Sequence, residues 1–217
     1  MKAKIVSVTL LMCIGVGYSQ RFVNLDFETT TITTIHNPGG DTYTAKTPGW
    51  SVNTFNYVNG DPNSIPYNNI ALDSASVNLE GTNSPYAPAI QGLYSILLQG
   101  GTAFAPTTNG ASIWQTAQVP VTAQSITYWG NALQVFFDGQ LLSFVAVSNS
   151  PSFTLWEANI SAYAGQTGQL EFTEPWQNSG LLDNIQFSSS PVPEPGVFGL
   201  SIFGGLALAW KRWRKAA

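Results

Sequence analysis

Short stretches in which apolar and polar residues alternate fill the chain from residue 22 to residue 187, separated by clusters of glycine, proline and asparagine. Alternation with a period of two is typical of β-strands, and many short strands between turn residues predict an all-β sandwich. In the first stretch Val23, Leu25 and Phe27 share one face. We expect strands at residues 23–28, 93–99, 112–119, 125–129, 133–137, 141–147, 153–160, 169–173 and 181–187.

The clearest local signal in the chain is the pair Asp138-Gly139, which stands between two apolar alternating stretches. Both residues tolerate positive φ, so the pair predicts a hairpin with a two-residue turn. Three long polar segments contain proline, at residues 29–41, 59–69 and 81–88. We expect these to be loops, and loops of this kind often carry binding residues.

The amino end has the pattern of an export signal. Lys2 and Lys4 precede an apolar segment, and the small residues Gly17 and Ser19 follow it. This order predicts a secretory signal peptide, residues 1–19, cleaved after Ser19.

Cys13 is the single cysteine of the chain and lies within this signal. Lipid attachment at Cys13 is not expected, because Met12 stands where a small residue belongs. After cleavage the chain would hold no cysteine, so its stability would come from its core and not from disulfides.

The carboxyl end carries three features in order: the motif V-P-E-P-G, an apolar segment at residues 197–210 and a basic tail. Proline fixes its own φ and holds the preceding residue extended, so the motif presents an exposed extended peptide. The apolar segment has 14 residues, fewer than the roughly 20 of a straight membrane-spanning helix, but flanking tryptophan and lysine lengthen the effective span. The motif residues are Val192, Pro193, Glu194, Pro195 and Gly196, and the tail residues are Lys211, Arg212, Arg214 and Lys215.

These three features together resemble the PEP-CTERM sorting signal of exported bacterial proteins. The resemblance covers residues 192–217, after a short linker that begins at residue 188. It implies export by the Sec machinery, a transient membrane anchor, and recognition by an exosortase-type membrane protease that delivers the protein to the cell surface or extracellular matrix. An ordinary single-pass tail anchor and a buried helix of a soluble domain are the alternatives.

Residues 20–187 have the length of one domain. Of the acidic residues only Glu194 lies outside residues 20–192, which leaves eleven there against Arg21 and Lys46, a formal net charge of −9. Nucleic-acid binding needs a basic surface, so this charge excludes it. Solubility would come from neutral polar side chains, a composition that suits partners such as glycans.

Five motifs follow one another along the chain: N-L-D-F-E at 24–28, P-G-W at 48–50, F-T-L-W-E at 153–157, I-S-A-Y-A-G-Q-T-G-Q-L-E-F at 160–172 and L-L-D-N-I-Q-F at 181–187. Their order is similar to that of the galactose-binding-like domains found in many carbohydrate-binding modules. The resemblance implies a jelly-roll β-sandwich, a fold that hosts sugar binders, lipid binders and inert spacers.

Strand alternation places Asp183 on the apolar side of the last strand, where an unpaired carboxylate is costly. Calcium would neutralise it, and the galactose-binding-like resemblance implies a structural Ca²⁺ with Glu28 and Asp183 as ligands and Asp26 as a third. In the alternative interpretation Asp183 lies at a strand end and accepts hydrogen bonds from backbone groups.

Aromatic side chains supply the candidate glycan-binding residues. Trp176 lies between two predicted strands, where its ring could stack on a sugar while Gln177 and Asn178 bind hydroxyls. Tyr57, Tyr67 and Tyr86 lie in the long loops. By contrast Trp50, Trp114, Trp129 and Trp156 lie in strand-like segments, where core packing explains them equally well.

Catalysis has little support in the sequence. His36 is the single histidine, and no serine-hydrolase elbow is present. Glu171 and Glu174 are three apart on a strand and would point to opposite faces. We therefore expect a non-enzymatic structural or glycan-contacting component of the exopolysaccharide layer. A dedicated carbohydrate-binding module is the alternative, and a glycoside hydrolase is a more distant one.

Overall fold

The computed structural model describes residues 20–53, 64–70, 74–102 and 110–192. The predicted signal peptide, the sorting residues beyond Val192 and Tyr57 lie outside these ranges. The elements are β1 (Thr31–Ile35), β2 (Thr42–Lys46), β3 (Ser51–Asn53), β4 (Ser64–Pro66), β5 (Ser76–Gly81), β6 (Tyr94–Gln99), β7 (Ala111–Gln118), β8 (Ser125–Gly130), β9 (Gln134–Phe137), β10 (Gln140–Leu141), β11 (Val145–Asn149), β12 (Thr154–Asn159), the 3₁₀ turn η3 (Ser161–Tyr163), β13 (Thr167–Glu174) and β14 (Ser179–Ser188).

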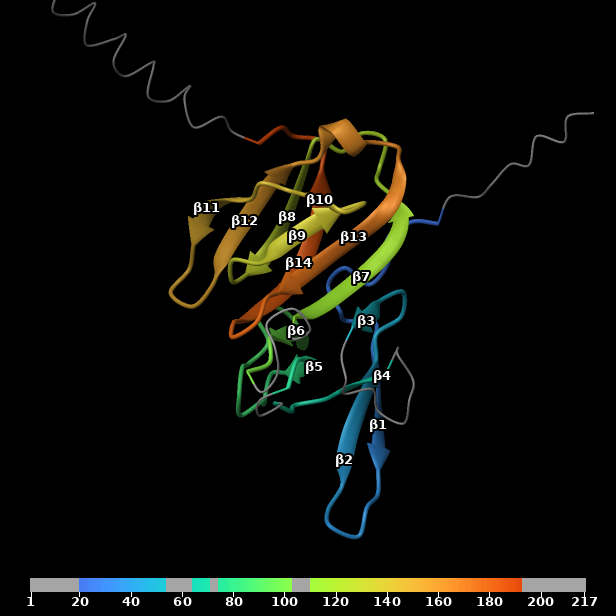
Figure 1. The fold of residues 1–217 in the computed structure, drawn as a ribbon, viewed down its shortest axis with the longest axis vertical. Helices are drawn as coiled ribbons and strands as arrows, with labels where there is room; N and C mark the ends of the chain where they lie inside the picture. Colours follow the sequence, from blue (N-terminus) through green and yellow to red (C-terminus); the bar gives the residue numbers. More distant parts are fainter. Residues whose placement is uncertain (1–19, 54–63, 71–73, 103–109, 193–217) are drawn as a thin grey trace, which may run out of the picture.

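Two antiparallel sheets form the main body, with β9, β13 and β7 in front of β8 and β14 in Figure 1. The five-stranded sheet has the order β10-β9-β13-β7-β3, and the six-stranded sheet has the order β11-β12-β8-β14-β6-β5. A small third sheet, β1-β2-β4, carries the β1–β2 hairpin that extends below this body. The all-β sandwich expected from the alternating pattern is confirmed.

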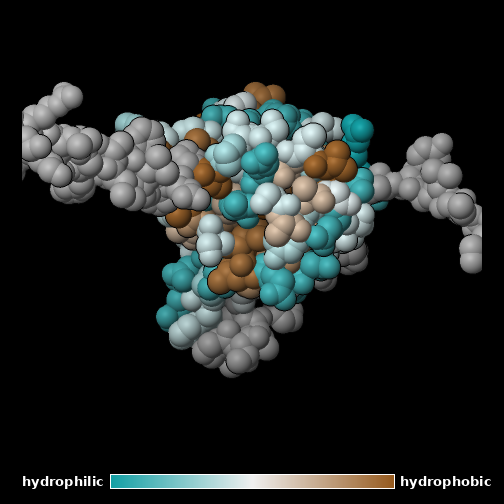
Figure 2. Space-filling view, turned by 90° about the horizontal axis from the view of Figure 1, so that it is seen from above, coloured by the Kyte–Doolittle hydropathy of each residue, from teal (hydrophilic) through white to brown (hydrophobic). Residues whose placement is uncertain are grey.

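The core lies between the two large sheets and is rich in aromatic rings. Phe172 on β13 is fully buried and packs edge-on against Tyr128 of β8 and against Trp50. Phe27 packs against the other side of Trp50, at a ring-centroid distance of 5.5 Å. This apolar filling takes the place of disulfides in holding the sheets together. On the face seen from above, apolar residues stand among polar ones (Figure 2).

The predicted hairpin is confirmed at Asp138-Gly139, which joins β9 to β10. Both residues have positive φ, 50° and 76°, as a two-residue turn requires. The strands predicted at 93–99, 112–119, 125–129, 153–160, 169–173 and 181–187 correspond to β6, β7, β8, β12, β13 and β14.

The strand predicted at residues 23–28 is wrong. Asn24 and Phe27 have positive φ, which breaks the alternation, and the Asn24 side chain accepts a hydrogen bond from Thr29 N. Val23 is consequently 44% exposed while Phe27 is buried. The predicted loop at 29–41 is also wrong in part, because its threonines form β1. Among the described residues no helix is long and apolar enough to span a membrane.

Candidate functional site

The connection between β13 and β14 is a tight turn pressed against the end of β6. Gly100 N donates to Asn178 O at 2.7 Å, and Asn178 N donates to Pro175 O at 3.2 Å. Gln177 has a φ of 64° at the tip of the turn. A side chain at Gly100 could not fit, because its Cβ would lie 1.9 Å from Pro175 O. These contacts fix the backbone of the turn.

The segment after β8 forms the opposite wall. Tyr128, buried at 0% exposure, donates its hydroxyl hydrogen to Asn131 O and accepts from Leu133 N. Burial raises the pKa of this phenol above its usual range, so it stays a donor. Asn131 Oδ1 in turn accepts from Leu181 N at 2.8 Å. The 131–133 segment is therefore held against β14.

Between these walls lies a pocket of about 300 Å³ that contains Glu174. Glu174 is the last residue of β13, faces the interior and is 4% exposed. Burial raises its pKa to about 7. Burial is the sole cause of this shift, and the carboxylate oxygens are not among the sealed, unpaired polar atoms of the described residues, so they reach the pocket. The other residues lining this pocket are Asn131, Ala132, Gln134, Pro175, Asn178 and Ser179.

A second pocket, of about 270 Å³, lies over β6 and β14 and shares Asn131 and Ser179 with the first. Leu97 and Leu181, paired across β6 and β14, contribute apolar surface. Tyr86, from the loop after β5, is 50% exposed and lines it. We call the two pockets together the turn groove. It presents an aromatic ring and neutral polar groups beside one buried carboxyl.

The three predicted glycan-binding residues differ in their position relative to the turn groove. Asn178 lines the groove, whereas neither Trp176 nor Gln177 is among its described lining residues. Trp176 is half-buried, and its Nε1 is buried without a hydrogen-bond partner among the described residues. Tyr86 lies in the groove, while Tyr67 is half-buried against Tyr94 with ring centroids 6.1 Å apart.

The strand tryptophans divide between interior and exterior. Trp50 is 1% exposed and its Nε1 donates to Asn24 O, so it is a core residue. Trp156 packs against the core and donates to Gly130 O. Trp114 and Trp129 are half-buried and each follows a core residue, Ile113 or Tyr128, so they lie on the outer faces of their sheets. The sequence alternation could not tell which face of these strands packs inward.

The residues proposed as calcium ligands meet around one short segment. Asp183 Oδ2 accepts from Gln91 N at 2.9 Å and Ser95 Oγ at 3.0 Å, and Oδ1 accepts from Asn184 N. Burial and, secondarily, nearby Glu28 raise the pKa of Asp183 to about 6, while these hydrogen bonds lower it. Two of the three donors are backbone N–H groups, as in the alternative interpretation, although Asp183 lies in the middle of β14 and not at a strand end.

Glu28 and Asp26 stand beside this carboxylate. Glu28 Oε1 accepts from Leu93 N at 2.8 Å and from Tyr94 N at 3.2 Å. Asp26 Oδ1 accepts from Glu28 N at 3.3 Å. No group of three His, Cys, Asp or Glu suited to a metal occurs among the described residues. Calcium at Glu28, Asp183 and Asp26 stays a prediction.

A further buried carboxyl, which the sequence did not predict, belongs to Glu80 on β5, a strand that is buried on both faces. Its exposure is 0%, and burial raises its pKa to about 7. Ser84 Oγ donates to its Oε2, while Oε1 lacks a partner in the described part of the chain. Residues 76–80 alternate polar and apolar, which predicts a solvated face for Glu80, so nothing in the local pattern reveals that this face is buried as well.

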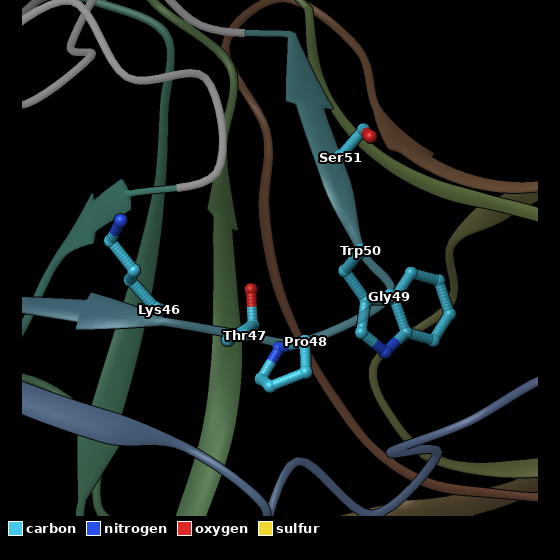
Figure 3. Close-up of a pocket in the computed structure, with 6 residues that line it drawn as sticks. All are labelled: Lys46, Thr47, Pro48, Gly49, Trp50 and Ser51. Atoms are coloured by element: carbon cyan, nitrogen blue, oxygen red, sulfur yellow. The ribbon is translucent and has the colours of Figure 1, made fainter.

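A third pocket, of about 390 Å³, is lined by Lys46 to Ser51, the segment drawn in Figure 3. Lys46 and Thr47 rise from the same side of this segment in the figure. Because the described lining is one continuous stretch and its Trp50 ring is buried, the pocket offers no aromatic platform.

The residues considered for catalysis do not meet. His36 Nδ1 lies 2.9 Å from Asp41 Oδ1 on the exposed β1–β2 hairpin. Glu171 pairs with Trp114 on the outer face of β13, whereas Glu174 faces inward. The two carboxylates therefore lie on opposite faces, as the spacing predicted.

No family model and no curated protein matches the chain. Among solved structures, an apo form cyclase from Fischerella sp. is similar with a TM-score of 0.42 and 15% identity over 80% of this chain and 98% of that one. The enzymatically active domain of tailspike protein 4 of bacteriophage CBA120 has a TM-score of 0.35 and 11% identity, over 65% of this chain and 19% of that one. Likenesses at these TM-scores carry no argument about activity.

Proposed function

We propose that this chain is an exported, non-enzymatic protein of the cell surface or extracellular matrix that contacts glycan through the turn groove. The observation that carries the proposal is the exposed ring of Tyr86 beside the neutral polar side chains of Gln99, Asn131 and Ser179. Flat rings bind the apolar faces of sugars, and a few placed amides and hydroxyls bind their hydroxyl groups.

The export and sorting part rests on the two ends of the chain. The V-P-E-P-G motif, its apolar segment and the basic tail support recognition by an exosortase-type protease, and residues 1–19 support Sec-dependent export. Replacing Pro193 and Pro195 by alanine in the full chain tests it, since the variant should stay membrane-bound in the native host. Normal release of this variant would contradict the role of the motif.

The jelly-roll assignment of the galactose-binding-like kind belongs to the same proposal. It is supported by the contact of the N-L-D-F-E segment with the last strand, where Ile185 N donates to Leu25 O at 2.9 Å. A structural calcium at Glu28, Asp183 and Asp26 stays a prediction of that resemblance. A calcium-dependent rise in melting temperature that D183N removes would support it, and no rise would count against it.

A glycan array with the purified full chain tests glycan contact. We expect Y86A to weaken binding by about tenfold, because the ring contributes on the order of 1 kcal/mol or more. Y43A is the matched control, since Tyr43 is 45% exposed on the β1–β2 hairpin and outside the groove. W176A tests the platform expected from sequence. Binding that survives Y86A and falls with W176A would move the site to the turn itself.

The alternative role is a matrix scaffold without a specific ligand. It predicts that no glycan on the array binds above background and that all three variants behave alike. A dedicated carbohydrate-binding module predicts saturable binding to one glycan class.

A further inference from the structure

The carboxyl of Glu174 stands in a space that the fold keeps open for it. Gly180 faces it from β14, and a Cβ there would lie 2.5 Å from Glu174 Oε1 and 2.8 Å from Leu133 Cδ2. Any larger residue at position 180 would therefore displace the carboxyl or close the pocket. Because Gly180 has no side chain, the Glu174 carboxyl has room to line the first pocket of the turn groove.

This acidic group has no internal compensation among the described residues. The residue is 4% exposed, no hydrogen bond from a described residue contributes to the pKa of its carboxyl, and the carboxyl lines the pocket. Arg21 forms a β-bridge with Gln118, and Gln118 pairs with Thr167 at the start of β13. Glu174 is at the other end of that strand. Lys46 lies on β2 of the third sheet. A buried carboxylate without a partner is costly, so a ligand that supplies a positive donor would relieve the cost.

We propose that the first pocket of the turn groove binds the protonated amine of an amino sugar, and hence that the glycan partner is a cationic, amine-bearing polysaccharide. This inference rests on the proposed glycan contact and names its substrate class. The Glu174 carboxylate receives the ammonium group, and neutral side chains around it, Asn131, Gln134, Asn178 and Ser179, face the sugar hydroxyls.

Charge over the whole domain favours the same partner. Residues 20–192 carry a formal net charge of −9, from eleven acids against two cations. Such a field attracts a cationic polymer and repels an anionic one. A metal ion suits this pocket less well, because a hard cation collects several oxygen ligands and Glu174 is the one carboxylate among the described residues that line it.

The environment of the carboxyl adds a pH signature. Burial raises the pKa of Glu174 to about 7, and the phenol of Tyr128 on β8 is the titratable group that faces it. An ammonium ligand must find Glu174 ionised, so binding should weaken as the pH falls below about 7. A neutral sugar would not show this dependence through Glu174.

Calorimetric titration of the full chain with glucosamine and N-acetylglucosamine oligomers of equal length tests the inference. At about pH 7, where both the ammonium group and the Glu174 carboxylate are present, we expect the amine form to bind at least about tenfold more tightly, and E174Q to remove this preference by removing the charge-assisted hydrogen bond. E157Q removes the same charge from β12 and should keep the preference. G180A should lose amine binding by filling the pocket, with melting curves to confirm that it folds.

Equal binding of both oligomers, unchanged by E174Q, would overturn the amine assignment and leave the proposed glycan contact standing. Binding of neither oligomer, together with an array that is otherwise positive, would also overturn the assignment alone. A blank array would contradict the proposed function itself. A lysine-rich peptide that binds as tightly as the glucosamine oligomer would overturn the assignment to a sugar.

Discussion

Replacing Glu174 by glutamine should make the protein more stable at alkaline pH and slightly less stable at acidic pH. The side chain is 4% exposed, and burial raises its pKa from 4.5 to about 7. Between these two values the folded state holds a proton that the unfolded chain has released. Stability therefore falls as the pH rises through this window, and the loss is complete above a pH of about 7.

The size of the effect follows from the two pKa values. The step from 4.5 to about 7 corresponds to about 3 kcal/mol of folding free energy. Glutamine keeps the shape and removes the charge, but its buried amide also lacks a partner, which costs about 1–2 kcal/mol at every pH. The constant cost cancels when the difference in unfolding free energy between wild type and E174Q is compared at two pH values.

Urea unfolding of wild type and E174Q at about pH 4.5 and about pH 8 measures this pH-dependent difference in unfolding free energy. The difference in unfolding free energy between the two proteins should change by about 3 kcal/mol between the two pH values, equivalent to about 6–12 °C in Tm for a domain of this size. E157Q on β12 is the control and should follow wild type. A difference between E174Q and wild type that does not vary with pH would refute the reasoning.

Three further substitutions probe the fold. F172A should destabilise the protein by about 3–5 kcal/mol in urea unfolding, because the fully buried ring packs between the sheets; a loss below about 1 kcal/mol would contradict this place in the core. G139A should cost only about 1 kcal/mol, because its φ of 76° is strained for alanine while nothing lies within 4 Å of the new Cβ; a loss above about 3 kcal/mol would contradict the turn geometry. D183A should cost about 1–3 kcal/mol by leaving buried donors unsatisfied, whereas D41A on the exposed hairpin should change stability little; equal effects would contradict the role of Asp183.

Local pattern was enough to predict most strands of the two large sheets. Strand β6 carries a continuous apolar run, and β13 alternates clearly between buried and half-buried residues. The pair Asp138-Gly139 defined a hairpin because few residues adopt positive φ. The segment around Asn24 and Phe27 failed, because positive φ at both positions breaks a strand whose alternation looks regular in sequence.

The candidate site was less accessible to sequence reasoning. Asn178 and Tyr86 were singled out, but what brings them to one groove is the packing of two loops against β14. Glu174 was considered only as one member of a surface pair, since burial at a strand end depends on what closes the sandwich there. The end of the sandwich at Glu174 is closed by Gly180 and by the 131–133 segment that Tyr128 holds, and neither is next to Glu174 in the sequence.

The sequence by itself determined the β character, the hairpin, the acidic composition and the expectation of export. A period of two places side chains on two faces, which is a local property of the backbone. Which face lies inside is a property of the neighbouring sheet, so only the tertiary structure put Trp114 outward and Glu174 inward. The same packing brought Glu28 and Asp183 to one short segment, 91–95, although they are far apart along the chain.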